Sequence, residues 1–342
     1  MPTNRSRPKP STLTHAFRRT ALRRLTADGH PQHARYDVAV DGLLYVDKPA
    51  GITSHDVVAI VRRAARSRRV GHAGTLDPFA TGLLVVAVGN CTRLLPYVQG
   101  EPKVYDAVVR FGAETDTDDI AGRVTVEASL PDLGGTSGSA ALDAAIRSLT
   151  GVLAQVPPAY SAKHVDGERA YAIARRGEAV QLAPVTVTVH RWEIQSCTGQ
   201  RLHARITCAG GTYVRALARD LGRALGSAAH CESLRRVSSG PAHVDRAATL
   251  ASLGPGSIAD GRVPLLSPLD ALGPMATEAL DTNAERELSQ GRAIPATQPG
   301  HTVAFVRAVA TALTAAPAVL GIGVRIAGER WQPRVVLLGS SA

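Results

Sequence analysis

The 342-residue chain is 44% hydrophobic, which is enough apolar surface for packed cores in two domains. Its formal net charge of +10 indicates an acidic partner, most commonly nucleic acid. No apolar run approaches the ~18 residues of a membrane-spanning helix. The spacing of the four cysteines is not that of a structural zinc site and indicates a reducing compartment, so we expect a cytoplasmic protein.

The first forty residues form a basic segment. Residues 1–40 contain eight Arg or Lys side chains against two aspartates, with prolines scattered near the start. This composition predicts a disordered tail, interrupted by a short helix around Leu13–Leu25. The folded part that follows is therefore only mildly basic.

A strand and a capped helix open the folded part. We predict a strand near Leu43–Val46, then a helix that Thr53 or Ser54 caps. Helical spacing aligns one apolar stripe: Val57, Val58, Val61, Ala64 and Ala65. Basic side chains occupy the other face and the exit: Arg62, Arg63, Arg66, Arg68 and Arg69. These cations are either an RNA-backbone contact, which we favour, or a solvated helix face.

Strands and helices then interleave without a regular βαβ order. The predicted strands are Leu83–Val88, Tyr105–Phe111, Val185–Ile194 and Leu202–Cys208. The predicted helices are Leu142–Leu149, Glu168–Arg176 and Tyr213–Leu225, the last closed by Gly226. A Gly-, Ser- and Thr-rich stretch, Gly134–Ser139, predicts a flexible surface loop. The pattern predicts a mixed α+β fold with a central, largely antiparallel sheet.

Composition divides the chain into four parts. After the tail, residues 41–253 form the main α+β domain. Residues 254–275 are rich in Gly, Pro and Ser, which predicts a linker. Residues 276–342 end in the apolar strands Val319–Ile326 and Arg334–Leu338, which predict a small β-rich domain.

The turn at residues 71–82, GHAGTLDPFATG, is the most informative segment. It holds one acid, Asp77, among three glycines and Pro78, directly before an apolar strand. Glycine lets the backbone take positive φ and approach a ligand, and proline fixes the residue after the acid. A carboxylate in such a turn suits chemistry better than core packing, and an Asx-type turn is the structural alternative.

This turn resembles the signature of the TruB family of pseudouridine synthases, which modifies the T-loop uridine of transfer RNA. Four further segments carry the resemblance in the family's order: GLLYVDKP with GITSHD (42–56), VY (104–105), PPAYSAK (157–163) and CAGGTYVR (208–215). The resemblance spans residues 41–240. It implies a pseudouridine synthase catalytic domain whose central sheet has a cleft for the acid, and a PUA-like RNA-binding domain at the C-terminus.

The resemblance also implies a catalytic set. The family's catalytic aspartate falls on Asp77, and a single carboxylate can serve as nucleophile or base. The sequence leaves open whether it attacks C1′, attacks C6 or removes the C2′ proton. Arg215 supplies the guanidinium that favours the charged acid, and Tyr105 stacks on the flipped base and handles the C5 proton. Because the isomerisation oxidises nothing and transfers no phosphate, we expect no cofactor and no metal.

Four further residues match substrate-binding positions of the family. His72 matches the histidine that fills the T-loop after base flipping, Tyr213 a pocket residue, and Leu234 an apolar pocket wall. Lys48 matches the lysine that supports the catalytic loop. Each has a structural alternative as a hydrogen-bonding or core side chain. We expect a monomeric enzyme that binds the T-stem-loop of transfer RNA, with no membrane partner.

Three other functions fit parts of the pattern. Related synthases that act on other RNA, including guide-RNA-dependent ones, share the motifs but work in a multiprotein particle. A transfer RNA chaperone or RNA-binding module could use the same cleft, although an intact Asp77, Tyr105 and Arg215 favour catalysis. A glycoside hydrolase normally needs two cooperating acids, and the turn supplies one. The sequence therefore predicts isomerisation of the T-loop uridine, position 55, to pseudouridine.

Overall fold

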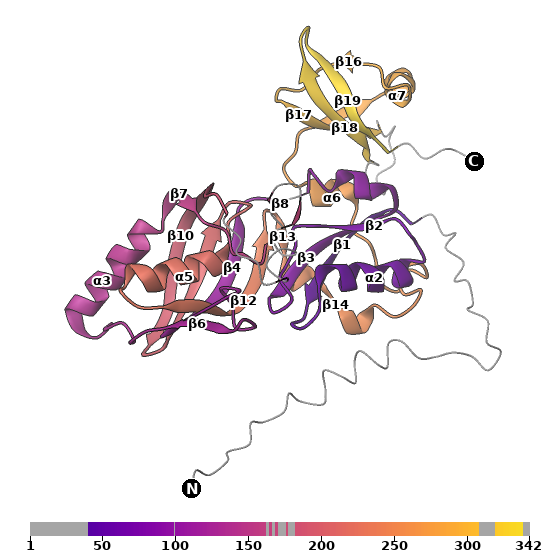
Figure 1. Ribbon diagram of the computed structural model, residues 1–342. Helices are drawn as coiled ribbons and strands as arrows, with labels where there is room; N and C mark the ends of the chain where they lie inside the picture. The colour runs from indigo at the N-terminus through magenta and orange to yellow at the C-terminus, as the bar shows by residue number, and fades with distance from the viewer. Residues whose placement is uncertain are drawn as a thin grey trace, which may run out of the picture. The chain divides into compact units, whose positions relative to one another are not determined.

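The computed structural model describes residues 40–98, 100–161, 164–165, 168–169, 176, 182–307 and 319–337. The predicted tail, except its last residue, and the helix at Leu13–Leu25 lie outside these residues. Within them, a ten-stranded mixed sheet and a five-stranded sheet account for most of the β-structure (Figure 1). No helix of the described part is long and apolar enough to cross a membrane.

The elements of the larger sheet and its covering layers follow one another along residues 42–272. The strands are β1 (Gly42–Lys48), β2 (Val70–Ala73), β3 (Thr81–Val88), β4 (Lys103–Phe111), β7 (Gly151–Gln155), β10 (Val185–Thr198), β11 (Arg201–Cys208), β12 (Ala229–Ser239), β13 (Ala242–His243) and β14 (Ala248–Thr249). The helices are α2 (Ser54–Ala65), α3 (Gly135–Ser148), α5 (Val214–Ala224) and α6 (Pro268–Leu272), with 3-10 turns η1 (Gly89–Leu94), η2 (Val244–Arg246) and η3 (Leu250–Ser252). Two short hairpins pair β5 (Ala113–Thr115) with β6 (Val124–Glu127) and β8 (His164–Val165) with β9 (Glu168–Arg169).

The larger sheet is mostly antiparallel, as the sequence predicts. Its strand order is β14-β1-β3-β12-β4-β11-β10-β7, with β13 on β12 and β2 on β3. Only the pairs β1–β14 and β3–β12 are parallel among its described strands. The β3–β12 pair is short, joining Thr81–Gly82 to Arg235–Arg236, and it connects the two halves of the sheet. The candidate site lies at this junction.

Helix α2 begins at the predicted cap. The Thr53 hydroxyl accepts a hydrogen bond from the Asp56 N–H, and the Asp56 carboxylate accepts one from the Thr53 N–H, which forms a capping box. The predicted apolar stripe is buried against β1 and β3. Arg66 ends the helix in a left-handed conformation (φ 46°).

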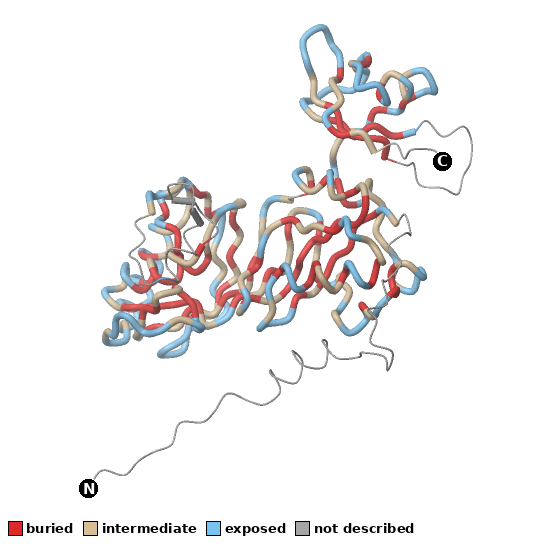
Figure 2. Tube along the Cα trace, turned by 45° about the vertical axis from the view of Figure 1, so that its right-hand side comes forward, coloured by how far each residue is buried: buried red, intermediate tan, exposed pale blue. Residues whose placement is uncertain are grey.

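The two faces of β1 and β3 are covered by different layers. Leu44 and Leu84 point toward α2, whereas their neighbours Leu43 and Leu83 belong to a second core. That second core also contains buried side chains of η1, α6 and the C-terminal sheet. Strands buried on both faces read as continuous apolar runs, which explains the sequence of Leu83–Val88. Figure 2 shows the buried segments concentrated along these central strands.

Helix α5 lies on β12 and β4 and brings a polar face to the site. Its Leu217 and Leu221 are fully buried in a core shared with β4 and β11. Burial of such side chains stabilises the fold by roughly 1.5–3 kcal/mol each, which fixes the helix on the sheet. Gly226 ends the helix with φ 67°, as the sequence predicts.

Two predicted elements are wrong. The stretch Gly134–Ser139 is not a loop, because α3 starts at Gly135. A Cβ on Gly138 would lie 2.4 Å from the backbone of Leu133, so this glycine allows the first turn to pack closely despite its poor helix propensity. The helix predicted from Glu168 does not begin there, since Glu168–Arg169 is strand β9. Its residues 170–175 lie outside the described part.

The Gly-, Pro- and Ser-rich segment after η3 is packed against the larger domain. Leu253 and Ile258 are buried in the same core as α2, and the N–H groups of Gly256 and Ile258 donate to the carbonyls of Arg63 and Ala64. Compositional turn signals therefore coincide here with a fixed conformation. The domain boundaries themselves remain a prediction.

The C-terminal sheet has the order β15-β17-β18-β19-β16. Its elements are β15 (Thr277–Leu280), α7 (Thr282–Ser289), β16 (Ile294–Pro295), β17 (Thr302–Arg307), β18 (Val319–Ile326) and β19 (Arg330–Val336). Trp331 is fully buried, and its indole N–H donates to the Glu278 carboxylate over 2.9 Å. Glu278 also accepts the N–H groups of Thr297 and Gln298, so a buried acid organises this small core.

Gly82 provides a direct test of the sheet junction. A Cβ at this position would lie 2.3 Å from the Arg236 carbonyl oxygen, and the backbone has φ +99°. We expect Gly82→Ala to lower the free energy of unfolding by roughly 3 kcal/mol or more, because both a clash and backbone strain are introduced. Urea denaturation of the purified variant measures this.

Gly254→Ala is the matched control for Gly82→Ala. A Cβ on Gly254 would meet no heavy atom of the described residues within 4 Å, and the φ of Gly254 is not positive. Its substitution should change stability by less than about 0.5 kcal/mol. Equal effects of the two substitutions would contradict the close β3–β12 approach.

Candidate active site

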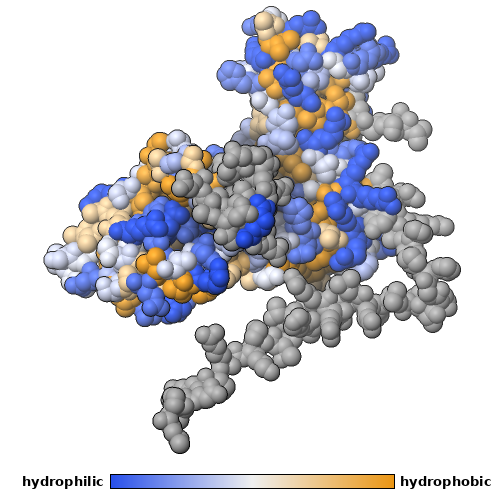
Figure 3. Space-filling model, viewed as in Figure 1, coloured by the Kyte–Doolittle hydropathy of each residue, from blue (hydrophilic) through white to orange (hydrophobic). Residues whose placement is uncertain are grey.

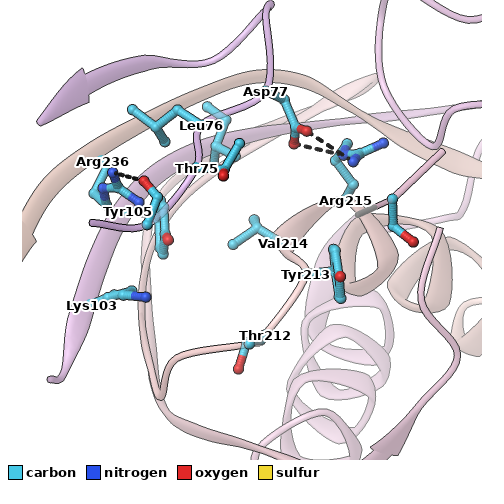
Figure 4. A pocket seen from close by; sticks show the side chains of 14 residues that line it. Thr75, Leu76, Asp77, Lys103, Tyr105, Thr212, Tyr213, Val214, Arg215 and Arg236 are labelled. Carbon is cyan, nitrogen blue, oxygen red and sulfur yellow. Dashed lines mark hydrogen bonds and ion pairs between the residues drawn. The ribbon is translucent and has the colours of Figure 1, made fainter. Parts of the chain in front are cut away.

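A pocket of about 250 Å³ opens at the sheet junction (Figure 4). It brings together the 71–82 turn, β4, β12 and the start of α5, which are far apart in the sequence. The lining residues are Gly74, Thr75, Leu76, Asp77, Lys103, Tyr105, Ser161, Gly211, Thr212, Tyr213, Val214, Arg215, Leu234 and Arg236. Five of the seven predicted site residues are therefore in this wall; His72 and Lys48 are not.

Lys48 holds the Asp77 turn from behind. Its buried ammonium donates to the carbonyls of Pro49, Ile52 and Pro78 at 2.9, 2.8 and 3.3 Å. Burial lowers the pKa of Lys48 to about 8, and the nearby Asp77 carboxylate opposes that shift. The lysine thus ties the segment after β1 to the turn, and its part in substrate binding stays a prediction.

The start of α2 holds the same turn from another side. The Ser54 hydroxyl donates to the Leu76 carbonyl at 3.1 Å and accepts the Leu76 N–H at 3.0 Å. The Gly51 N–H donates to the Pro78 carbonyl at 2.7 Å. Residues on both sides of Asp77 are therefore fixed by hydrogen bonds, so the acid has a defined place at the pocket edge.

Asp77 forms an ion pair with Arg215. Arg215 Nη2 donates to Asp77 Oδ1 at 3.1 Å, and Nε lies 2.9 Å from Oδ2 without the alignment of a hydrogen bond. The guanidinium is almost fully buried, whereas the carboxylate keeps 35% of its side-chain surface exposed. The acid is thus presented at the pocket edge with its counter-charge beside it, as Figure 4 shows.

Arg215 is itself held by several acceptors. Nη1 donates to the Thr117 carbonyl at 2.6 Å, and Nη2 also donates to the Tyr160 carbonyl at 3.0 Å. A second carboxylate, Asp119, lies 3.5 Å from Nη1. One turn further along α5, Arg219 pairs with Asp118 at 2.7 Å. Sequence reasoning missed these two acids, which only the TDTDD run marks.

Tyr105 lies on the opposite wall, on β4. Its hydroxyl is hydrogen-bonded by Arg236 of the paired strand β12 (Figure 4). Burial raises the pKa of Tyr105, so the phenol stays protonated at neutral pH. Arg236 is fully buried and also donates to the carbonyls of Leu83 and Gly74, at 2.8 Å each. Sequence reasoning missed Arg236, although alternation on β12 places it on the same face as Leu234.

Tyr213 is the N-cap of α5, and Gln155 clamps its backbone. Gln155 Oε1 accepts the Tyr213 N–H at 2.9 Å, and Nε2 donates to the Tyr213 carbonyl at 3.1 Å. Gln155 is 2% exposed, and no sequence motif marks it, because the two residues are 58 positions apart. Its amide fixes where α5 begins, and therefore where Tyr213 and Arg215 stand.

His72 lies on β2 outside the pocket wall. Its ring meets the His55 ring edge-on, with centroids 5.6 Å apart, and its buried Nδ1 has no hydrogen-bond partner among the described residues. Burial is the main cause that lowers the pKa of His72, so the imidazole is neutral at physiological pH. Its role in the RNA loop stays a prediction.

The basic face of α2 is partly engaged within the protein. Arg66 pairs with Asp260 at 3.1 Å, and Arg69 donates to the Asn90 side chain at 2.9 Å. Arg62 and Arg63 are exposed. Hydrophilic side chains are interspersed with hydrophobic ones over the face drawn in Figure 3. An RNA-backbone contact at this helix stays a prediction.

The pocket's donor set suits an organic substrate better than a metal ion. Among the described residues, no three His, Cys, Asp or Glu side chains gather as a metal site. The lining contains one carboxylate against Lys103, Arg215 and Arg236. A cationic wall around a single acid matches an anionic ligand on which that acid acts.

Comparisons with known proteins identify the family of the chain. The model of the TruB family pseudouridylate synthase N-terminal domain matches residues 62–214, and that of the tRNA pseudouridylate synthase B C-terminal domain matches residues 215–270. The tRNA pseudouridine synthase B of Thermobifida fusca is 51% identical over 62% of this chain and 74% of its own length. That of Gloeobacter violaceus is 43% identical over 75% of this chain and 87% of its own length.

Solved structures show the same fold. A chain in the structure of an H/ACA RNP bound to a substrate RNA containing 2′-deoxyuridine has a TM-score of 0.62 at 20% identity, over 90% of this chain and 87% of that one. A chain in the structure of a Cbf5–Nop10–Gar1 complex has a TM-score of 0.62 at 22% identity, over 90% of this chain and 88% of that one. These two likenesses show a common fold, and the family models and relatives above show that the chain is a pseudouridine synthase. The chain belongs to the TruB family, as its motifs predict.

Gln155→Glu tests the clamp on Tyr213. An ionised glutamate accepts the Tyr213 N–H but repels its carbonyl, whereas a protonated one can serve both, as the amide does. Burial raises the pKa of a carboxyl group, so protonation begins above the usual range. We expect the activity of Gln155→Glu, relative to the unsubstituted protein, to recover at least severalfold as pH falls from 8 to 5.5.

Gln155→Leu serves as the control for this pH dependence. It removes both hydrogen bonds and has no titrating group, so its activity relative to the unsubstituted protein should be low at every pH. Single-turnover rates at saturating RNA, measured across the range, provide the comparison. A flat ratio for Gln155→Glu would show that the amide does not position the site.

Proposed function

We propose that this protein isomerises the T-loop uridine at position 55 of transfer RNA to pseudouridine. The observation that carries the proposal is the Asp77–Arg215 ion pair at the edge of a pocket walled by Tyr105 and Leu234. The names of its relatives, tRNA pseudouridine synthase B at 38–51% identity, support a transfer RNA substrate. Because its proposed substrate is transfer RNA, we also propose that the protein is cytoplasmic.

The reaction requires the target base to leave the stack and enter the pocket. The N1–C1′ bond breaks, the uracil turns, and a C5–C1′ bond forms. The proton on C5 is lost and N1 gains one, so no electron donor or acceptor is needed. Asp77 is the one carboxylate among the described lining residues, and we assign it the covalent or proton-transfer work at the sugar or base.

The other pocket residues have distinct roles in this proposal. Arg215 aims Asp77 and supplies its counter-charge, since its planar guanidinium contacts both carboxylate oxygens. Tyr105 stacks on the flipped uracil with the face of its ring, which lines the pocket, while Arg236 holds its hydroxyl in place. Leu234, 7% exposed, supplies an apolar wall, and Tyr213 borders the same space.

The remaining parts would add RNA contacts. We propose that residues 41–253 are the catalytic domain, 254–275 the connection, and 276–342 a PUA-like domain that binds RNA. The basic residues 1–40 would contact the RNA backbone without taking part in the reaction. Because Asp77, Arg215 and the pocket walls come from one chain, a monomer suffices for the reaction.

A guide-RNA-dependent synthase is the alternative within the same fold. The likeness to the H/ACA structures rests on 20–22% identity, whereas relatives named tRNA pseudouridine synthase B reach 51%. The difference favours a transfer RNA enzyme. A protein that acts alone on a T-stem-loop is therefore the expected result.

Asp77→Asn tests the proposed function directly. The protein is incubated with an unmodified T-stem-loop. The RNA is then treated with carbodiimide, and each pseudouridine is mapped as a stop in reverse transcription. We expect one site in the T-loop, and no product with Asp77→Asn. Binding should stay within a few-fold, because affinity comes mainly from backbone contacts.

Asp106→Asn is the matched control for the charge change. Asp106 lies on β4 and pairs with Arg205 at 2.7 Å, outside the pocket wall. Its activity should equal that of the unsubstituted protein. Turnover by a carefully purified Asp77→Asn sample, or product only in ribosomal RNA, would overturn the assignment.

Arg215 substitutions separate charge from geometry. Arg215→Met leaves Asp77 without its counter-charge and should lower the single-turnover rate by at least about 100-fold. Arg215→Lys keeps the charge but not the planar fork, so it should retain more activity. Arg223, on the same helix as Arg215, is 58% exposed and pairs with the buried Glu114 of β5; Arg223→Met is the control and should be near normal. A loss of affinity at an unchanged maximal rate would instead make Arg215 a phosphate contact.

A further inference from the structure

Lys103 lines the pocket and carries a positive charge, but it has no role in the proposed reaction. It lies on β4 two residues before Tyr105, so both side chains are on the same face of the strand. Figure 4 shows its ammonium on the far side of the pocket from the Asp77–Arg215 pair. It has no hydrogen bond or ion pair among the described residues, whereas Arg215 and Arg236 are both engaged.

Two glycines leave space around this ammonium. A Cβ on Gly210 would lie 3.4 Å from Lys103 Nζ, and a Cβ on Gly74 would lie 3.7 Å from it. The nitrogen is therefore between the loop that precedes Asp77 and the loop that precedes α5. Glu101 is close by and its charge opposes the lowering of the Lys103 pKa, but its Oε1 accepts the Gly210 N–H at 2.7 Å. Backbone without side chains lets an anionic group approach closely.

The charge of the pocket indicates what that group is. Three cations, Lys103, Arg215 and Arg236, face one carboxylate, Asp77, among the lining residues. Burial lowers the pKa of Lys103, so a ligand that restores a full counter-charge is favoured over one that offers a neutral oxygen. In an RNA substrate the full negative charges are on the phosphates.

We propose that Lys103 binds the phosphate next to the flipped uridine and so anchors that nucleotide in the pocket. The inference rests on the proposed function, because the ligand is the RNA of that reaction. Lysine serves as a point-charge phosphate binder. The contact would act opposite Asp77, so that the nucleotide is held by its phosphate at one end of the pocket while the acid acts at the other.

The experiment combines a protein substitution with a change in the RNA. T-stem-loops are made with one uncharged methylphosphonate linkage, either 5′ or 3′ to the target uridine, or with 4-thiouridine at the target. Dissociation constants are measured with Lys103→Met, Lys103→Arg and the unsubstituted protein. Arg191→Met, which removes an exposed cation outside the pocket, is the control, and thermal unfolding checks that each variant is folded.

We expect Lys103→Met to weaken binding of the native stem-loop roughly tenfold and one methylphosphonate to weaken binding to the unsubstituted protein similarly. The two changes together should cost no more than either alone. Lys103→Arg should keep most of the affinity, and Arg191→Met should show no coupling to the linkage. The slope of log Kd against the logarithm of the salt concentration should be smaller for Lys103→Met than for the unsubstituted protein, by roughly 0.7–0.9.

Independent, additive losses for Lys103→Met and both linkages would overturn the proposal. Coupling of Lys103→Met to 4-thiouridine alone would also overturn it and assign the lysine to the uracil carbonyl. These readouts are dissociation constants, so they do not depend on turnover. A protein that shows the coupling but forms no pseudouridine would contradict the proposed function and leave the phosphate contact standing.

Discussion

The ion pair between Asp77 and Arg215 is the interaction on which the site depends. It joins a turn at the beginning of β3 to the first turn of α5, 138 residues later. A buried guanidinium without its carboxylate would be an uncompensated charge, which is costly in a protein interior. Arg215 therefore needs Asp77, Asp119 and two carbonyls as much as Asp77 needs a counter-charge. Neither half of the sheet holds the site alone.

The rest of the junction keeps this pair in place. Lys48, Ser54 and Gly51 fix the backbone on both sides of Asp77, and Gln155 fixes the backbone in front of Arg215. Each of these groups bonds to main-chain atoms, so the backbone that carries the two side chains of the ion pair is held in place. Preorganised polar groups need little rearrangement when charge develops during a reaction. The hydrogen bonds that fix the backbone around Asp77 and Arg215 therefore contribute to preorganising the site.

The sequence predicts the local features of this fold well. The cap at Thr53, the glycine at Gly226 and the apolar strands follow from rules that act over a few residues, and the motifs place Asp77, Tyr105 and Arg215 in one pocket. It fails where distant packing decides. Gly138 favours a loop by composition, yet it lies in a helix, where a larger side chain would clash with the backbone of Leu133. Propensity is a weak guide when such contacts oppose it.

The residues that sequence reasoning missed share a physical property. Gln155 and Arg236 each bond to a group that is distant in the chain, and Lys103 lies between loops that are distant from it in the chain. The residues next to them in the sequence do not mark them as special, because a polar residue in a strand ordinarily lies on the solvent face of the sheet. When such a residue is buried instead, its polar side chain needs a hydrogen-bond partner. Arg236 and Gln155 find their partners within the protein. Lys103 finds none among the described residues, and that difference separates a structural polar residue from one that awaits its substrate.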